Sequence, residues 1–257
     1  MIHPFNRQAL FGLLALAVGA LPACTTMARV HPELEARRSR IARAAVLPPE
    51  TKFILVTFKG DNPRMSAEEE SAKAALPGMI AAKLREHGLA VDESGVASNS
   101  DLRFQATELQ ATFDQALGDL FATPQGPTRQ ASQVSRSLGP QAARVADPLG
   151  VDALALVRIE GYSKSGGEIA KDLAKAFVVG FMTAGTLVPV SPRSGATIVS
   201  ALIDGSTGDV LWTNVARSQS ASFDAPGLQA LVNAVFMDFP PGGFGAGATG
   251  AVKAGEN

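Results

Sequence analysis

Two periods of apolar residues recur along this chain, one of two residues that favours strands and one of three to four that favours helices. Strands are expected at 52–59, 89–91, 151–162, 196–204 and 210–218. Helices are expected at 66–87, 101–118, 131–146 and 224–239. A strand–helix–strand unit, further helices, a long strand, a hairpin and a closing helix indicate an α/β fold, with a mixed sheet flanked by helices.

The run at 151–162 is the strongest strand signal in the chain. Leu156 and Val157 belong to its two opposite faces, and both faces begin apolar, which predicts a central strand covered on each side. Arg158 and Glu160 are expected to mark the point where one of those faces reaches water.

Proline and glycine divide the expected helices. Pro77-Gly78 is expected to interrupt the helix at 66–87, because proline cannot continue the backbone hydrogen-bond ladder. Gly139-Pro140 is expected to break the helix at 131–146. The whole stretch from about 100 to 147 is interpreted as a helical insertion in a single domain that covers 51–240.

The first 23 residues have the layout of a secretory signal peptide. Arg7 precedes an apolar run over 9–21, and small residues lead into Cys24. The apolar run is shorter than the roughly 20 residues of a transmembrane helix. Cys24 is the only cysteine, so lipidation would explain its position; the alternative is an ordinary cleavage site that happens to contain a cysteine.

Leu21-Pro22-Ala23-Cys24 resembles the lipobox of bacterial lipoproteins. The resemblance implies that Cys24 is acylated through its sulfur and becomes the N-terminus of the mature protein. Thr25 follows instead of an aspartate, which under the same resemblance favours the periplasmic face of the outer membrane. Two or more acyl chains hold a protein firmly on a bilayer without a transmembrane helix.

Residues 24–50 are interpreted as a tether and 241–257 as a disordered, Gly/Ala-rich tail. The tether carries four arginines close together, for which two interpretations remain open. They could attract anionic lipid headgroups, or they could simply lie on a solvated helix face. The four are Arg37, Arg38, Arg40 and Arg43.

The stretch 169–190 contains 15 consecutive uncharged residues, 176–190. It could be a helix packed in the core, an oligomer contact or a segment that touches the membrane. The uncharged run is shorter than the roughly 18 residues expected for a membrane span. Its large apolar side chains are the candidate interface residues Phe177, Phe181 and Met182.

Composition excludes some functions. The net charge is −1, which gives no basic footprint for a nucleic-acid partner. One tryptophan and one tyrosine in 257 residues make an aromatic platform for sugars or bases unlikely.

Catalytic motifs are also missing from the sequence. The three histidines, His3, His31 and His87, lie in the leader, the tether and a helix end, so no Ser-His-Asp or Cys-His arrangement is expected. Phosphate-loop and zinc motifs are absent. We therefore expect no enzymatic activity, no cofactor and no metal.

Three aspartates near strand ends are candidates for chemistry. Asp152, Asp204 and Asp209 could supply paired carboxylates, but isolated aspartates at strand ends are usually turn and cap residues. Asp204, Ser206 and Asp209 also offer oxygens for a metal, although the distal glutamate of a calcium loop is absent. A plain turn is the preferred interpretation.

Two motifs resemble a known group of proteins. Gly150-Val-Asp-Ala-Leu-Ala-Leu156 after a helix, and Asp204-Gly-Ser-Thr-Gly-Asp-Val-Leu-Trp212 before the closing helix, resemble lipoproteins related to the TolB N-terminal domain and the curli-secretion protein CsgG. The resemblance covers about residues 50–240. It implies an α/β sandwich and a role as an assembly or export accessory.

Together these features predict an outer-membrane lipoprotein that acts as an interaction or assembly module. Its partners would be the membrane through Cys24, other envelope proteins and further copies of the same chain. The expected contact surfaces are 169–190 and the end of the hairpin near Trp212. The alternative is an export-channel component or a ligand-binding module in which 169–190 contacts the bilayer.

Overall fold

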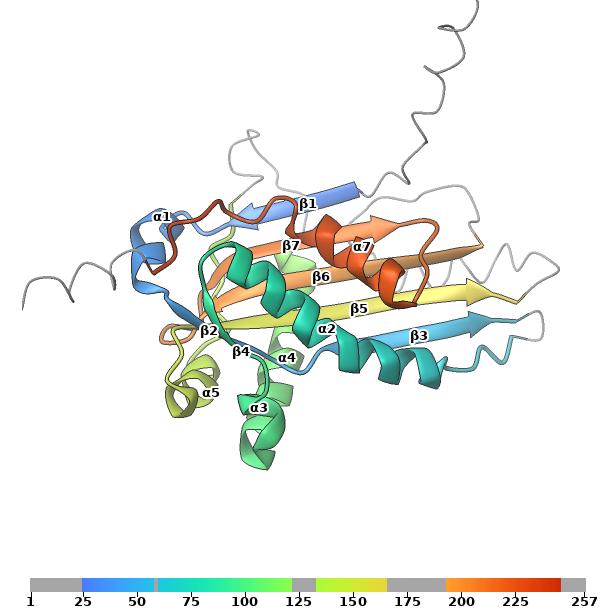
Figure 1. The fold of residues 1–257 in the computed structure, drawn as a ribbon, viewed down its shortest axis with the longest axis horizontal. Helices are drawn as coiled ribbons and strands as arrows, with labels where there is room; N and C mark the ends of the chain where they lie inside the picture. The colour runs from blue at the N-terminus through green and yellow to red at the C-terminus, as the bar shows by residue number, and fades with distance from the viewer. Residues whose placement is uncertain (1–24, 58–59, 122–132, 166–192, 246–257) are drawn as a thin grey trace, which may run out of the picture.

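The computed structural model describes residues 25–57, 60–121, 133–165 and 193–245. These residues form a seven-stranded sheet in the order β1-β7-β6-β5-β2-β4, with β3 also paired to β5 (Figure 1). The strands are β1 (Thr25–Val30), β2 (Arg43–Val46), β3 (Glu50–Val56), β4 (Ala90–Asp92), β5 (Ala153–Lys164), β6 (Ser194–Asp204) and β7 (Val210–Ser218). Parallel and antiparallel pairs are both present, which confirms the α/β class with a mixed sheet.

Helices cover the sheet. They are α1 (Leu34–Arg37), the short 3₁₀ turn η2 (Arg38–Arg40), α2 (Ser66–Glu86), α3 (Gly95–Ser98), α4 (Ser100–Leu120), α5 (Gln141–Leu149) and α7 (Ala225–Phe236). Asp224 caps the last helix, because its carboxylate accepts the Gly227 N–H at 3.0 Å. In the described part of the chain, no helix has both the length and the apolar character that a membrane span requires.

The central position of β5 is confirmed. It pairs with β6 over its whole length and, on its other side, with β2 and then β3 in parallel. Between β2 and β3 lie Pro48 and Pro49, which have no N–H to donate to a ladder. The chain therefore bulges there and resumes pairing with the same strand.

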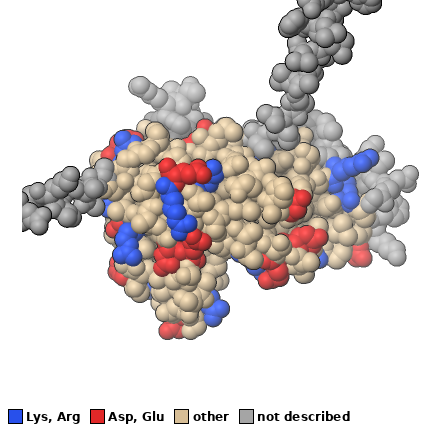
Figure 2. All heavy atoms as spheres, viewed as in Figure 1, with Lys and Arg blue, Asp and Glu red and all other residues tan. Residues whose placement is uncertain are grey.

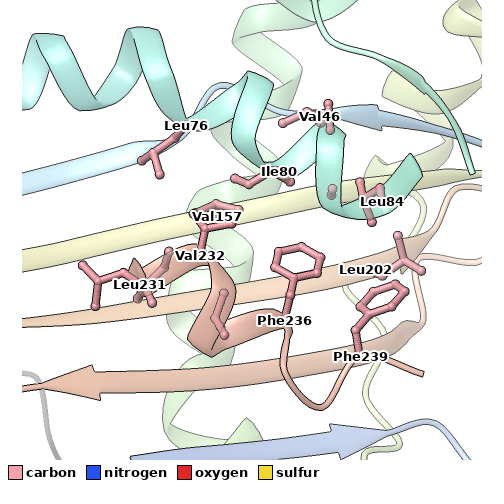
Figure 3. Packing of buried hydrophobic residues seen from close by; sticks show 14 of the residues in the cluster. Val46, Leu76, Ile80, Leu84, Val157, Leu202, Leu231, Val232, Phe236 and Phe239 are labelled. Carbon is pink, nitrogen blue, oxygen red and sulfur yellow. The ribbon is translucent and has the colours of Figure 1, made fainter. Parts of the chain in front are cut away.

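One hydrophobic layer lies on each face of the sheet, between the sheet and the helices that cover it. α2 and α7 lie on one face of the sheet, and α3, α4 and α5 lie behind it (Figure 1). In the first layer, Ile80 of α2 and Phe236 of α7 lie over β5 and β6, where Val157 and Leu202 point toward them (Figure 3). In the second, Leu109 and Phe113 of α4 pack on the opposite side of the same strands, so the expected insertion forms one of the two helical layers.

The interpretation of 24–50 as a tether is wrong for its described residues, 25–50. β1 pairs antiparallel with β7, from Thr25↔Arg217 to Val30↔Trp212, and β2 pairs with both β4 and β5. These strands have only 6 and 4 residues, too few to display a clear alternation in sequence. Their partners are distant in sequence: β7 and β5 lie more than a hundred residues away, and even β4 begins at Ala90, so local patterning could not reveal them.

Two arginines of the basic cluster are neutralised within the domain. Arg37 lies 2.7 Å from Asp209 and also binds Glu33. Arg38 lies 2.7 Å from Glu35 and donates to the Pro241 carbonyl. These contacts favour a structural role for both side chains over attraction to lipid.

The break expected at Pro77 is also wrong, because α2 continues through it. Leu76, Ile80 and Leu84 are fully or almost fully buried on one side of the helix. Their burial outweighs the missing hydrogen bond of the proline. The helix expected at 131–146 is wrong for its described residues before Gly139-Pro140, where Gln133 and Ser137 instead form isolated β-bridges; Gly139 has φ +84°, and helix α5 begins only at Gln141.

The expected disordered tail is wrong for its first residues. Phe244 is 5% exposed, and its ring centroid lies 5.7 Å from that of Phe239. The Gly245 N–H donates to the Arg38 carbonyl at 3.2 Å. An aromatic residue in a Gly/Ala-rich stretch is therefore enough to dock this part of the chain, while 246–257 lie outside the described residues.

Candidate functional site

Of the candidate interface residues, the structure describes Trp212 alone. Trp212 is 1% exposed, and its indole N–H donates to the Asp238 carbonyl at 3.2 Å. Its ring packs on Phe236 and Phe239, with centroids 5.4 and 4.7 Å away. The prediction that Trp212 belongs to an exposed contact surface is wrong, because α7 and the residues after it cover that face of β7. Cys24, Phe177, Phe181 and Met182 lie outside the described residues.

The β6–β7 turn uses the oxygens that were considered for a metal. Asp204 accepts the N–H groups of Ser206 and Thr207 at 3.0 and 3.2 Å, while Asp209 lies 2.7 Å from Arg37. Burial alone would raise the pKa of Asp209, but hydrogen bonds from Arg37 and Thr207 outweigh it and lower that pKa. These side chains stabilise the turn, in agreement with the interpretation as a plain turn. Among the described residues, no group of three or more His, Cys, Asp or Glu side chains is arranged to hold a metal.

Asp152 likewise serves the backbone. Its carboxylate accepts the N–H groups of Ala42 and Arg43, each at 2.9 Å, and so fixes the start of β2 beside β5. The Asp152 carbonyl accepts the Gly205 N–H, which brings the β6–β7 turn to the same end of the sheet. The three aspartates thus stabilise the β6–β7 turn and the start of β2.

The strongest concentration of buried charge lies around Arg158 on the α4 side of the sheet. Arg158 contacts Asp114 of α4 and Glu160 of β5, and its guanidinium lies 3.4 Å from Glu50 of β3. The side chains of Arg158 and Glu160 are only 15% and 5% exposed. Three carboxylates thus share one buried cation, in a group that we call the Arg158 cluster.

Two pKa values in the Arg158 cluster depart from their ordinary range. Burial, followed by the neighbouring Asp114 carboxylate, raises the pKa of Glu50 from 4.5 to about 7, although Arg158 opposes the shift. Burial lowers the pKa of Arg158, but hydrogen bonds to Glu160 and Asp114 outweigh it and raise that pKa overall. A protonated Glu50 can donate to Asp114, whose Oδ1 is buried and accepts no hydrogen bond from the described residues.

Gln110, one helical turn before Asp114, completes the join between α4 and the sheet. In the amide orientation that satisfies both neighbours, its nitrogen donates to the Pro48 carbonyl at 3.1 Å and its oxygen accepts the Glu50 N–H at 3.2 Å. These bonds replace part of the ladder that the two prolines interrupt. The Arg158 cluster can therefore hold α4 on β3 and β5 and can exchange one proton near neutral pH.

Sequence reasoning missed the Arg158 cluster. Arg158 and Glu160 were expected to face water, whereas Glu160 is buried and the side chain of Arg158 is mostly covered. The available signal was a cation and an anion two residues apart on one face of an otherwise apolar strand. A pair of this kind predicts further charged partners, but not that they are Glu50 and Asp114.

Comparisons with known proteins give little further information. No family model matches the chain, and no curated protein matches it. Among solved structures, the PelC dodecamer from Paraburkholderia phytofirmans is similar with 12% identity, 83% coverage of this chain, 95% coverage of that chain and a TM-score of 0.38. A single-substitution variant of that dodecamer gives 11% identity, 83% and 96% coverage, and a TM-score of 0.35. Similarity at this level supports no inference about function.

Proposed function

We propose that this chain is a lipid-anchored protein of the cell envelope whose domain serves as an interaction or assembly module on the periplasmic side of the outer membrane. The leader and the lipobox-like Leu21-Pro22-Ala23-Cys24 support the anchor. The resemblance to assembly and export accessories supports the role.

The observation that carries the proposal is the position of β1. Its first residue, Thr25, directly follows Cys24 and is already paired with Arg217 of β7. Consecutive Cα atoms are about 3.8 Å apart, so an acylated Cys24 would hold the folded domain against the bilayer with no spacer. Partners on the membrane would then meet a rigid sheet.

The outer side of β1 offers a contact surface for such partners. Of the described residues, Val134 reaches this side, donating its N–H to the Val30 carbonyl at 3.1 Å. Backbone groups alternate along an antiparallel strand, so those of Thr26 and Ala28 also point outward. Edge strands with outward-pointing N–H and C=O groups pair readily with other chains.

Exposed apolar side chains lie beside this edge. Met27 is 38% exposed on β1, and Met237 is 71% exposed just after α7. Asp238, the neighbour of Met237, accepts a hydrogen bond from Thr26 at 2.9 Å, which places Met237 near the edge. Methionines suit adaptable protein contacts, so we assign the assembly surface to β1 and Met237.

The anchor is tested by mass spectrometry of the full chain purified from membranes. We expect a mature N-terminus at Cys24 that carries acyl chains, and we expect Cys24→Ala to leave the membrane fraction. Cleavage without acylation, or membrane retention of Cys24→Ala that does not depend on detergent, would contradict the anchor.

The assembly surface is tested by light scattering of the full chain in detergent. The expected result is a defined oligomer whose mass falls in Met237→Glu. Phe104→Glu is the matched control, because Phe104 is 66% exposed on α4 and does not belong to the proposed surface. A monomeric parent protein, or equal effects of the two substitutions, would overturn the assignment.

One observation favours the alternative of a channel component. Ser165 and Arg193, the described residues that bound 169–190, lie at the end of β5 and the start of β6, toward which the N-terminal end of β1 also points. A membrane-active segment would thus emerge on the same side as the anchor. If the leaderless Cys24→Ala protein required detergent to remain in solution, the channel would become the preferred function.

A further inference from the structure

One row of paired residues crosses five strands beside the N-terminal end of β1. Thr25 pairs with Arg217, which pairs with Thr197. Thr197 pairs with Glu160, which pairs with Lys52 on its other side. Neighbouring strands lie about 4.8 Å apart, so Arg217 is the residue next to the one that follows Cys24. Any surface that Cys24 enters is close to this row.

Three cations, Lys52, Lys164 and Arg217, lie on one face at this end of the sheet, and a fourth, Arg193, lies at the same end just before β6. Side chains separated by an even number of residues point to the same face of a strand, so Lys164 shares the face of Glu160. Arg193 directly precedes the first residue of β6. The Lys164 N–H donates to the Arg193 carbonyl at 2.8 Å, which places both beyond the row toward the tips of β5 and β6. Figure 2, which views the molecule from the side of α2 and α7, shows basic side chains at this end of the sheet. We call Lys52, Lys164, Arg193 and Arg217 the basic end.

The basic end has no acidic partner within the described residues, since none of its four members forms an ion pair there. Glu160, the acid in the same row, is held by Arg158. Elsewhere, Arg37, Arg64 and Lys83 each bind a carboxylate. Among the described residues, no carboxylate therefore neutralises the charges of the basic end.

Arg217 shows the missing partner most directly. Its Nε is buried and has no hydrogen-bond partner, and burial lowers the pKa of its guanidinium. A partly desolvated cation is costly unless an anion accepts its hydrogen bonds. A phosphate can do so, because the planar guanidinium donates two parallel hydrogen bonds to it.

We propose that the basic end binds the phosphates of anionic phospholipid headgroups when Cys24 is acylated. The proposal rests on the proposed lipid anchor and adds an orientation to it. The tips of β5 and β6 contact the headgroup layer, whereas β4 and the β6–β7 turn, at the other end of the strands, point away from the membrane.

The test places the lipidated full chain in vesicles and measures quenching of a fluorescent label by a quencher attached to lipid. Cys24 is the only cysteine and would be acylated, so an introduced cysteine is the single labelling site. Ser220→Cys lies just past β7 at the basic end, and Ser94→Cys lies beside β4 at the opposite end; both positions are exposed. With phosphatidylglycerol in the vesicles, we expect several-fold stronger quenching at position 220 than at 94.

Charge dependence is tested with variants. Lys164→Gln, Arg193→Gln and Arg217→Gln together should reduce quenching at position 220 to the level found in pure phosphatidylcholine. Arg103→Gln with Arg144→Gln is the matched control, because these exposed arginines lie on α4 and α5 and form no ion pair within the described residues. Circular dichroism of each variant verifies that it folds.

Equal quenching at positions 220 and 94 would overturn the proposal. So would quenching at position 220 that changes neither when phosphatidylglycerol is omitted nor when the three cations are substituted. Mass spectrometry of the same sample reports the acyl chains, so a failed anchor is recognised separately. In that event, quenching at position 220 by vesicles added to the unacylated protein decides whether the basic end binds anionic lipid.

Discussion

Ionisation of Glu50 lowers the stability of the folded protein, by an amount that depends on pH. Its pKa is about 7 in the folded protein against an ordinary value of 4.5, first because of burial and then because of Asp114. Between these two values the folded protein binds a proton that the unfolded chain releases. The free energy of unfolding therefore falls as pH rises from about 4.5 to about 7, and the loss is complete above that range.

Glu50→Gln should remove this dependence. The amide stays neutral and can still donate to Asp114, so the variant should be more stable than the parent protein at pH 8 and close to it at pH 5. Urea unfolding at the two pH values measures the difference. Glu108→Gln is the control, because Glu108 is exposed on α4 and should give no such pH-dependent gain. A Glu50→Gln protein that is less stable at pH 8 would show that the negative charge is needed to hold Arg158.

At the same scale, Trp212 and Arg158 show what alternation along a strand can and cannot reveal. Alternation assigns Trp212 and its neighbours to opposite faces, but it does not tell which helix will cover each face. Trp212 is buried because the closing helix docks on β7. Arg158 is buried because α4 supplies Asp114. Both outcomes depend on contacts between elements distant in sequence.

At the scale of elements, α2 combines a strong apolar face with a local defect. Pro77 cannot donate a hydrogen bond to the carbonyl four residues earlier, and its ring crowds that carbonyl. The helix nevertheless extends over 21 residues, since Leu76, Ile80 and Leu84 are buried against the sheet. Tertiary packing, which a local rule about proline does not include, decides this element.

Replacing Pro77 with alanine should therefore stabilise the protein. The gain expected is about 1–3 kcal/mol, because alanine restores the hydrogen bond but makes the unfolded chain more flexible. Gly78→Ala is the matched comparison, with an expected gain of about 0.5–1 kcal/mol. A methyl group at Gly78 would meet only Glu93, at an ordinary 3.7 Å. Urea unfolding measures both, and a loss in Pro77→Ala would mean that α2 needs the shape the proline gives it.

Long elements were predictable and short ones were not. The helix expected at 101–118 corresponds to α4, whose Leu102, Leu109 and Phe113 are buried as one face. β1 and β2 were missed because a strand of 4–6 residues carries little local signal and gains its stability from distant partners. The same limit explains the mistaken tether.

Considered as a whole, the molecule assembles its charged sites from distant parts of the chain. Glu50, Asp114 and Arg158 meet only because α4 crosses behind the sheet where β3 and β5 pair. Arg217 lies beside Thr25 only because β1 pairs with β7. The sequence could indicate charge on an apolar strand and an anchor at Cys24, but the pairing that joins such features needs the complete sheet.

The C-terminal residues 238–245 close the first hydrophobic layer in the same long-range way. Phe239 packs on His87 at the end of α2, with ring centroids 4.7 Å apart, and Phe244 packs on Phe239. Arg38 donates to the Pro241 carbonyl at 3.3 Å. This segment thus joins α2, α7 and η2, so the domain should depend on it.

A chain that ends at Met237 should be less stable than one that ends at Gly245 by at least about 3 kcal/mol, because two buried phenylalanines are lost. Urea unfolding of the two proteins measures the difference. Since domains are only about 5–15 kcal/mol stable, the shorter chain could fail to fold, and Phe244→Ala in the full chain then provides the milder change. That substitution should cost about 1.5–3 kcal/mol, the value of burying one such side chain. If neither change lowered stability, residues 238–245 would not be part of the folded core, and the contact between Phe239 and His87 would have no energetic role.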